Sequence, residues 1–338
     1  MDAKITKKRL ASMLSYDWLK IIGVALAIIF FWVLLLTVTS TKITSTQEFI
    51  VYNYQSNNKL DENYYKHLEK SVKDKTFSYE VITWETFDLK ADGNYAFSRL
   101  TSYLKSDMGD VIFIPHVIDE STRYTDVNGK DAYWTHTQRF LNGYASVLYN
   151  FSTDDSQNEG LFDEIAGYLN RYYNGNYQTG SLDKEKIEKD FVSRIKRTKD
   201  KRFKTAEQIA QGKIDEVARI EKCRNALVKM QEYLTEGIIE LTPLTNAKND
   251  GKAVEVVYEG KYALNLCPSG NKDKAYYASY AEKLKDIVSY KGKAEEGKTP
   301  PDTAEDMCVM LFRFDSIETG LGYEGLLYVQ YLIESCLH

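Results

Sequence analysis

The sequence predicts an α/β domain built on a parallel sheet and preceded by one transmembrane helix. Residues 21–38 form a run of eighteen residues without a charge or a proline. Strand-like and helix-like segments alternate between residues 49 and 115, and strands joined through helices pair in parallel with right-handed crossovers. The segment DVIFIP at 110–115 is apolar after its first residue, which is typical of a strand buried on both faces of a sheet.

The apolar run comes close to the length of a bilayer core, because an α-helix rises about 1.5 Å per residue. We predict a transmembrane helix at 18–40, a cytoplasmic N-terminus at 1–17 and a polar tether at 41–48. The basic residues near the helix are Lys4, Lys7, Lys8, Arg9 and Lys20 before it and Lys42 after it. This asymmetry predicts a single-pass protein of the cell membrane whose residues 49–338 lie outside the cytoplasm.

A cleaved signal peptide is the alternative, since a T-S-T segment after the apolar run resembles a cleavage site. The apolar run is longer than a usual signal core, and the segment before it is long for a signal peptide. No cysteine follows the run closely, so a lipid cannot be attached there. We therefore expect the helix itself to hold the protein in the lipid bilayer.

Composition indicates a large folded domain behind this helix. The chain is 43% hydrophobic and 28% charged, with a mean hydropathy of -0.44, which are values of globular proteins. The segment after residue 47 carries 38 basic and 47 acidic side chains, a net charge of -9. An acidic domain argues against nucleic acid as a partner.

The first α/β pieces are read from hydrophobic periodicity. The expected order is a strand at 49–56, a helix at 61–75, a strand at 78–87, a helix at 94–108 and a strand at 110–115. This βαβαβ order predicts a doubly wound lobe. A hairpin should follow at 123–134, because Asn128 and Gly129 lie between extended aromatic flanks. The spacing of acidic residues there does not fit an EF-hand calcium loop.

The second half of the chain begins with a long charged helical segment at about 183–236. Its stretch RIKRTKDKRFK at 194–204 holds seven basic residues; a solvated helix end is the favoured interpretation, and a patch for anionic headgroups or a partner is the functional one. The later elements are a pair of strands at 253–267 around Glu259 and Gly260, a helix at 275–289, a linker at 291–302, a strand at 307–314 and a helix at 323–336.

The four cysteines are scattered, with no CxxC pair and no Cys/His cluster, at Cys223, Cys267, Cys308 and Cys336. This pattern predicts no metal site. Buried free thiols are the favoured interpretation for Cys267 and Cys308, which lie in apolar strand-like runs, while disulfides stay an alternative. No motif for a cofactor is present, so we expect none.

The segments FIVYNYQS, SYEVITWETF and SDMGDVIFIP resemble the first lobe of the extracellular solute-binding proteins of bacterial ABC importers, in which a Gly-Asp pair often opens the third strand. The likeness covers residues 49–115 well and the later pieces loosely. Two features depart from the family: a membrane helix stands in place of a lipidated cysteine, and residues 49–338 are few for the sugar-binding branch. The resemblance implies a periplasmic-binding-protein-like ectodomain that captures a small solute, such as a sugar, for the permease subunits of an importer.

Ligands of open α/β sheets bind beyond the carboxyl ends of the strands. The main candidates for ligand binding are Tyr54, Gln55, Asn57, Trp84, Glu85, His116 and Asp119, with Ser56, Asn265, Ser269, Arg313 and Asp315 as further strand-end residues. Aromatic rings supply flat apolar faces, and amides and carboxylates take hydroxyl groups. The structural alternatives are a core position for Trp84, a loop role for His116, and an ion pair of Arg313 with Asp315 or Glu318.

Catalysis has little support in the sequence. The four histidines lie far apart, and no GxSxG, HExxH, P-loop or GxGxxG motif is present, so we expect no enzyme. Two functions remain: solute capture for an importer, or an ectodomain that binds or modulates a partner protein without a small ligand. Two full lobes around a polar cleft would favour the first, and a second lobe reduced to the helices of 183–236 would favour the second. The ligand and the oligomeric state are not encoded in any motif.

Overall fold

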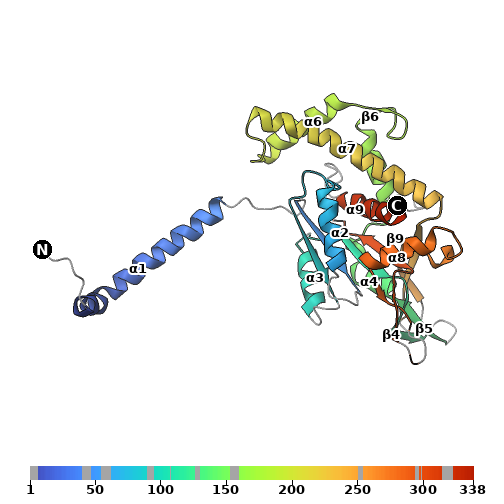
Figure 1. The fold of residues 1–338 in the computed structure, drawn as a ribbon, viewed down its shortest axis with the longest axis horizontal. Coiled ribbons are helices and arrows are strands. Elements are labelled where there is room, and N and C mark those ends of the chain that lie inside the picture. The colour runs from blue at the N-terminus through green and yellow to red at the C-terminus, as the bar shows by residue number, and fades with distance from the viewer. Residues whose placement is uncertain are drawn as a thin grey trace. The chain divides into compact units, whose positions relative to one another are not determined.

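The computed structural model divides into two units, Met1–Thr44 and Ser45–His338, drawn in Figure 1. It describes residues 7–39, 47–54, 62–89, 95–106, 108–125, 130–152, 160–249, 254–293, 297, 299–313 and 323–338.

The first unit is the helix α1, Lys7–Thr39. Its window Lys20–Thr37 is long and apolar enough to cross a membrane and has no buried residue. A helix that is apolar all round needs lipid or a protein core to cover it. One N-terminal helix able to span a membrane is therefore confirmed, although a cleaved signal sequence would meet the same criteria.

The second unit is built on one six-stranded sheet in the order β2-β1-β3-β12-β9-β8. Its strands are β1 (Glu48–Asn53), β2 (Thr83–Asp88), β3 (Val111–Pro115), β8 (Glu240–Asn249), β9 (Val254–Asn265) and β12 (Met307–Leu311). β1 pairs with β2 and β3 in parallel. β12 pairs antiparallel with β3 and β9, and β8 pairs antiparallel with β9. The sheet is therefore mixed, with β1, β2, β3 and β9 running in one direction.

Helices cover both faces of this sheet. They are α2 (Glu62–Lys73), α3 (Ala96–Leu104), α4 (His136–Tyr144), α5 (Leu161–Asn170), α6 (Lys184–Thr198), α7 (Ala206–Thr235), α8 (Tyr277–Ile287) and α9 (Glu324–Leu337). Val111 and Phe113 of β3 belong to one hydrophobic core, with residues of α2, α5, α7, α8 and α9. Ile112 and Ile114 belong to a second core, with residues of α3 and α4. The alternation of a strand's side chains between two cores explains why β3 reads as a continuous apolar run.

The βαβαβ order of residues 48–115 is confirmed, with one shifted boundary. β2 begins at Thr83 rather than at residue 78. The residues before it form a turn whose side chains bond elsewhere: the Tyr79 hydroxyl donates to Glu216, and Glu80 pairs with Arg202. Long-range polar contacts thus hold these residues away from the strand.

The expected pair of strands at 253–267 is wrong. β9 is a single strand that passes through Gly260, where its pairing with β8 shifts register between Thr242 and Leu244. A glycine within a strand often marks such an irregularity rather than a turn. The partner strand β8 was not predicted, and the connection from β8 to β9 lies outside the described residues.

The remaining short elements refine the other expectations. The expected hairpin at 123–134 is confirmed as β4 (Ile118–Thr125) paired antiparallel with β5 (Asp131–Thr135), while Asn128 and Gly129 lie outside the described residues. The expected linker at 291–302 begins and ends in a small antiparallel pair, β10 (Tyr290–Lys291) with β11 (Asp302–Thr303). Another short pair, β6 (Tyr173–Asn174) with β7 (Ser181–Leu182), precedes α6.

The helical segment 183–236 consists of two antiparallel helices, α6 and α7, which lie side by side in Figure 1. α6 ends at Lys199, whose φ of 53° places it in the left-handed region. α7 begins with a capping box, in which Thr205 and Gln208 bond each other's backbone. We call this pair of helices the helical arm.

All four cysteines are buried and unbonded, as favoured from the sequence for Cys267 and Cys308. Residues 45–338 form one compact unit. The two-lobed arrangement of solute-binding proteins is therefore not confirmed, and the mixed α/β architecture with one large sheet is what the structure establishes.

Candidate functional site

The carboxyl ends of the parallel strands bring three of the predicted residues to one edge of the sheet. Tyr54 follows β1, His116 follows β3, and Asp119 lies at the start of β4. The Tyr54 ring lies 5.7 Å from the ring of His136, a residue of α4 that was not predicted for this site. With Arg139, described next, these residues form what we call the carboxyl-edge cluster: Tyr54, His116, Asp119, His136 and Arg139.

Asp119 is the buried carboxylate of this cluster, 6% exposed. Its Oδ1 accepts hydrogen bonds from the backbone and hydroxyl of Ser121 at 3.0 and 2.6 Å. Its Oδ2 lies 2.6 Å from Arg139 Nη1 and 3.4 Å from His136 Nδ1. Burial raises the pKa of Asp119, but the hydrogen bonds from Ser121 and Arg139 outweigh it, so that the net shift is downward. Asp119 is therefore held ionised and paired.

His116 takes a structural role. Its Nδ1 lies 2.7 Å from the Thr137 hydroxyl, and its backbone N–H donates to the Asp306 carbonyl. Burial lowers the pKa of His116, with a smaller opposing effect of Asp306. His116 thus joins two segments: its imidazole bonds the start of α4, and its backbone N–H bonds the loop before β12.

A capping box positions the two cluster residues that the sequence analysis missed. The Thr135 hydroxyl accepts from the Gln138 backbone N–H, and the Gln138 side chain accepts from the Thr135 backbone. This motif starts α4 at His136, so His136 and Arg139 lie one turn apart near the helix start. The T-x-x-Q pattern at 135–138 was the sequence signal that could have located them.

The other predicted residues lie elsewhere or outside the described part. Trp84 pairs with Phe49 at the amino end of β1 and packs against the first core. At about 3.3 Å per residue, five residues along β1 separate this end of the sheet from Tyr54 by about 16 Å. Glu85 follows Trp84 in β2, so neither residue reaches the carboxyl edge of the sheet. Gln55, Ser56, Asn57 and Asp315 lie outside the described residues.

The late strand-end residues meet at Asp306, which sequence reasoning also missed. Asn265 Nδ2 and the Ser269 backbone N–H both donate to Asp306 Oδ1, at 2.9 and 3.0 Å. The expected partners of Arg313 lie outside the described residues, and the structure pairs Arg313 with Glu164 at 2.9 Å. Within the described ranges, no group of three or more His, Cys, Asp or Glu side chains could hold a metal ion.

Large apolar side chains on the segments that follow β2 and β3 face solvent. Tyr95 is 83% exposed and Phe97, which contacts the Tyr54 ring, is 41% exposed. Ile118 is 52% and Tyr133 38% exposed on the β4–β5 hairpin. The four residues Tyr95, Phe97, Ile118 and Tyr133 are called the apolar rim. Polar groups paired inside and apolar groups exposed outside are typical of an interaction surface.

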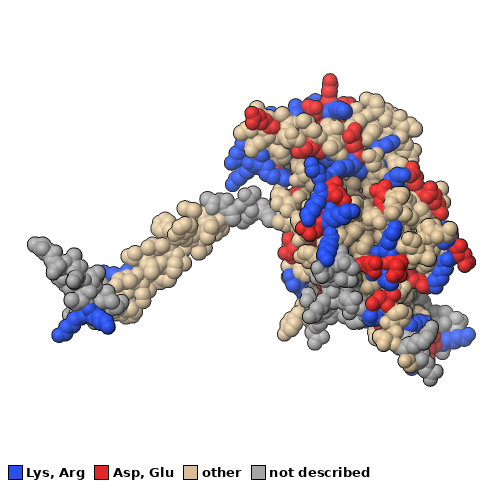
Figure 2. Space-filling model, in the orientation of Figure 1, with Lys and Arg blue, Asp and Glu red and all other residues tan. Residues whose placement is uncertain are grey.

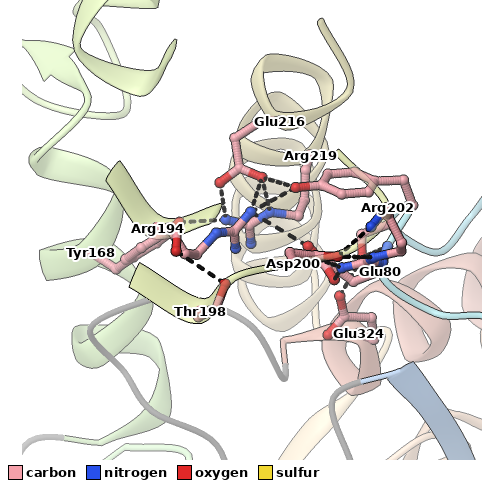
Figure 3. A network of polar contacts seen from close by, with 11 residues as sticks. Glu80, Tyr168, Arg194, Thr198, Asp200, Arg202, Glu216, Arg219 and Glu324 are labelled. Carbon is pink, nitrogen blue, oxygen red and sulfur yellow. Dashed lines mark hydrogen bonds and ion pairs between the residues drawn. The ribbon is translucent and has the colours of Figure 1, made fainter. Parts of the chain in front are cut away.

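A second charged cluster lies under the helical arm and is drawn in Figure 3. Its ion pairs are Arg194 and Arg219 with Glu216, at 3.0 and 2.8 Å, Arg202 with Glu80 and Asp200, at 2.6 and 2.7 Å, and Arg194 with Glu80, at 3.4 Å. We call this set of six residues the ion network. It connects the arm to the turn before β2.

The network corrects part of the interpretation of the basic run 194–204. Arg194 and Arg202 turn inward, with side chains 12% and 24% exposed, whereas the other basic residues of the run are exposed: Lys196, Arg197, Lys199, Lys201 and Lys204. Burial would raise the pKa of Glu216, but Arg219 and Arg194 lower it to about 2. A buried, fully ionised pair of this kind attaches structural elements to each other.

Comparisons of the chain with protein-family models, with curated proteins and with solved structures found no match.

Proposed function

We propose that residues 47–338 form an extracytoplasmic domain, held at the cell membrane by α1, that binds a partner protein through its apolar rim. The main support is the arrangement at the carboxyl edge: the oxygens of Asp119 are occupied by Ser121 and Arg139, while Tyr95 and Ile118 are exposed. A surface of this kind offers apolar area rather than free hydrogen-bonding groups, which suits a protein better than a polar solute.

The single compact unit supports the same choice. A second lobe that closes on a ligand was the feature expected of a solute-binding protein, and the region 183–236 supplies two helices instead. Confinement to one membrane raises the effective concentration of partners anchored there. The partner that the sequence resemblance suggests is a permease subunit of an ABC importer.

Site-specific photocrosslinking in cells tests the proposal. A photoreactive residue at position 95 or 118 of the full chain should give one discrete adduct, and mass spectrometry should identify the same protein from both positions. Position 65 is the matched control, because Tyr65 is 49% exposed on α2, away from the rim. Equal adducts from all three positions, or none from 95 and 118, would contradict the proposal.

Orientation is tested separately. The basic residues before α1 predict that residues 47–338 lie outside. Protease added to intact protoplasts should remove this domain and leave a membrane fragment of about 40 residues that contains α1. Protection of the whole domain would place it in the cytoplasm and exclude the importer as its partner.

Solute capture remains the second candidate, because Tyr54, His116 and Asp119 do meet at one edge of the sheet. A thermal-shift screen of the full chain against sugars, amino acids and peptides tests it, since a ligand that binds only the folded state raises the midpoint by mass action. A shift that Asp119→Asn abolishes would favour solute capture over partner binding.

A further inference from the structure

A pocket of about 450 Å³ opens on the helical arm, separate from the carboxyl edge. Its walls come from the two residues that follow α5, one face of α6 and the buried Glu216 of α7. Four basic side chains line it: Arg171, Lys186, Arg194 and Arg197. The three from α6 lie on one helix face because their spacing is eight, three and eleven residues. The pocket has the size of a small-ligand site.

Arg194, which lines this pocket, is bonded through only one of its terminal nitrogens among the described residues. Nη2 of Arg194 is bonded to the Tyr79 hydroxyl and to Glu216, at 2.6 and 3.0 Å. Its Nη1 is buried and has no hydrogen-bond partner within the described ranges. Buried guanidinium nitrogens are almost always bonded in folded proteins.

The acidic residues of the pocket are already engaged. Glu216 is paired with Arg219 and Arg194, and the Tyr172 hydroxyl bonds Asp190. Lys186 lies over the Tyr172 ring, 5.8 Å from its centroid. Neither Lys186 nor Arg197 has a carboxylate partner in the part of the chain that the structure describes. The pocket therefore presents uncompensated positive charge.

We propose that this pocket, called the basic pocket, binds a phosphate group. A phosphate carries several strong acceptor oxygens in a compact tetrahedron, which suits the forked donors of Arg194 and Arg197 together with the single ammonium of Lys186. The exposed basic residues at the end of the arm extend the same positive surface, and Figure 2 shows Lys and Arg side chains gathered there. The group can come from free phosphate or from an anionic lipid headgroup.

Thermal unfolding of the full chain in phosphatidylcholine nanodiscs tests binding. Sodium phosphate should raise the midpoint more than sodium chloride of equal ionic strength, because a ligand of the folded state adds stability by mass action. The double variant Lys186→Gln/Arg197→Gln should lower the affinity for phosphate by on the order of tenfold or more, because each substitution removes a charged hydrogen bond. Both side chains are exposed, so the variant should fold.

Lys189→Gln is the matched control, because Lys189 is an exposed residue of the same helix that does not line the pocket. This variant should keep the full phosphate shift. An equal shift in the wild type, the double variant and the control would indicate a general salt effect and overturn the proposal. The absence of any shift beyond that of chloride would overturn it as well.

A second set of measurements distinguishes the source of the phosphate group. In nanodiscs of phosphatidylglycerol without added phosphate, an increase of the midpoint that the double variant loses and Lys189→Gln keeps assigns the site to lipid headgroups. An increase seen only with added phosphate in phosphatidylcholine assigns it to a soluble phosphate compound. An increase of the midpoint in both sets of measurements indicates a site that recognises the phosphate group whatever molecule carries it.

Discussion

The ion network and the carboxyl-edge cluster each surround one buried carboxylate, but they connect different parts of the chain. Asp119 is bonded by Ser121 and Arg139, two and 20 residues away. Glu216 is bonded by Arg194 and by Tyr79, which is 137 residues away. Arg139 is 51% exposed, whereas Arg219 beside Glu216 is 3% exposed. Asp119 therefore lies at a surface beside an exposed arginine, whereas Glu216 joins the helical arm to the turn before β2.

This difference matters because the two carboxylates have the same sign of pKa shift. Hydrogen bonds and ion pairs lower the pKa of both Asp119 and Glu216 against the effect of burial. The shift alone thus says nothing about role. Exposure of the paired arginine separates a recognition surface from an architectural joint.

The largest effect is expected from Glu216→Gln. Removing the charge leaves Arg219 and Arg194 buried beside a neutral amide, and breaking a buried ion pair costs about 3–5 kcal/mol of the free energy of unfolding. Urea denaturation of the full chain in detergent, followed by tryptophan fluorescence, measures it. Glu188→Gln is the control, since Glu188 pairs with Lys213 between the same two helices but at the surface, where a pair contributes less than about 1 kcal/mol. Equal losses of the free energy of unfolding in both variants would show that the buried ion pair contributes no more than the exposed one.

The second largest effect is expected from acid, which should weaken the ion pairs of Glu216. The pKa of Glu216 is about 2 in the folded protein against 4.5 for a free side chain, so its ionised form stabilises the fold at pH values above 4.5. That contribution, about 3 kcal/mol, should be lost as the pH falls from 4.5 towards 2. Denaturation at pH 7, 5, 4 and 3 should give a flatter dependence for Glu216→Gln than for the wild type. Parallel curves would show that Glu216 does not carry the acid sensitivity.

Close packing inside the arm gives a smaller effect. Gly212 of α7 faces Phe191 and Phe203, and a Cβ there would lie 2.5 and 2.6 Å from their rings. Gly212→Ala should lower the free energy of unfolding by about 1–3 kcal/mol, because overpacking outweighs the better helix propensity of alanine. Gly167→Ala on α5 meets open space and should raise stability by up to about 1 kcal/mol. A stabilising Gly212→Ala would show that the two helices pack less tightly.

Asp119→Asn should have the smallest effect on stability. The amide oxygen can keep the bonds from Ser121, and Arg139 is exposed enough to turn to water. We expect a loss of about 1 kcal/mol in the same denaturation experiment, together with a weaker photocrosslink from position 118. A loss as large as that of Glu216→Gln would make the carboxyl edge an architectural joint as well.

Several elements could be read from the sequence because their signals are local. The βαβαβ order, the β4–β5 hairpin and both helices of the arm follow from periodicity and turn residues over short windows. The length and composition of the apolar run of α1 predict a helix able to span a membrane. Candidate-site residues that directly follow a strand, such as Tyr54 and His116, were placed correctly at the carboxyl edge for the same reason.

The pairing of distant segments could not be read in this way. β12 pairs antiparallel with β3, and β8 is a strand that periodicity did not reveal. Trp84 was expected near the carboxyl end of a strand at 78–87 but is the second residue of β2, because Tyr79 and Glu80 are bonded to Glu216 and Arg202 and the strand begins at Thr83. Arg194 and Arg202 looked like solvated charges, but they are partly buried and paired with carboxylates.

The sequence by itself determined the apolar helix near the N-terminus, the order of the local elements and the two-sided burial of β3, since each depends on residues close together in the chain. Only the tertiary structure decided that residues 45–338 form one unit, which strands neighbour β3, and which charges are buried. Those properties depend on contacts between segments more than 100 residues apart, such as Tyr79 with Glu216. A single sequence carries no local signal for contacts of that range, because many pairings satisfy the same hydrophobic pattern.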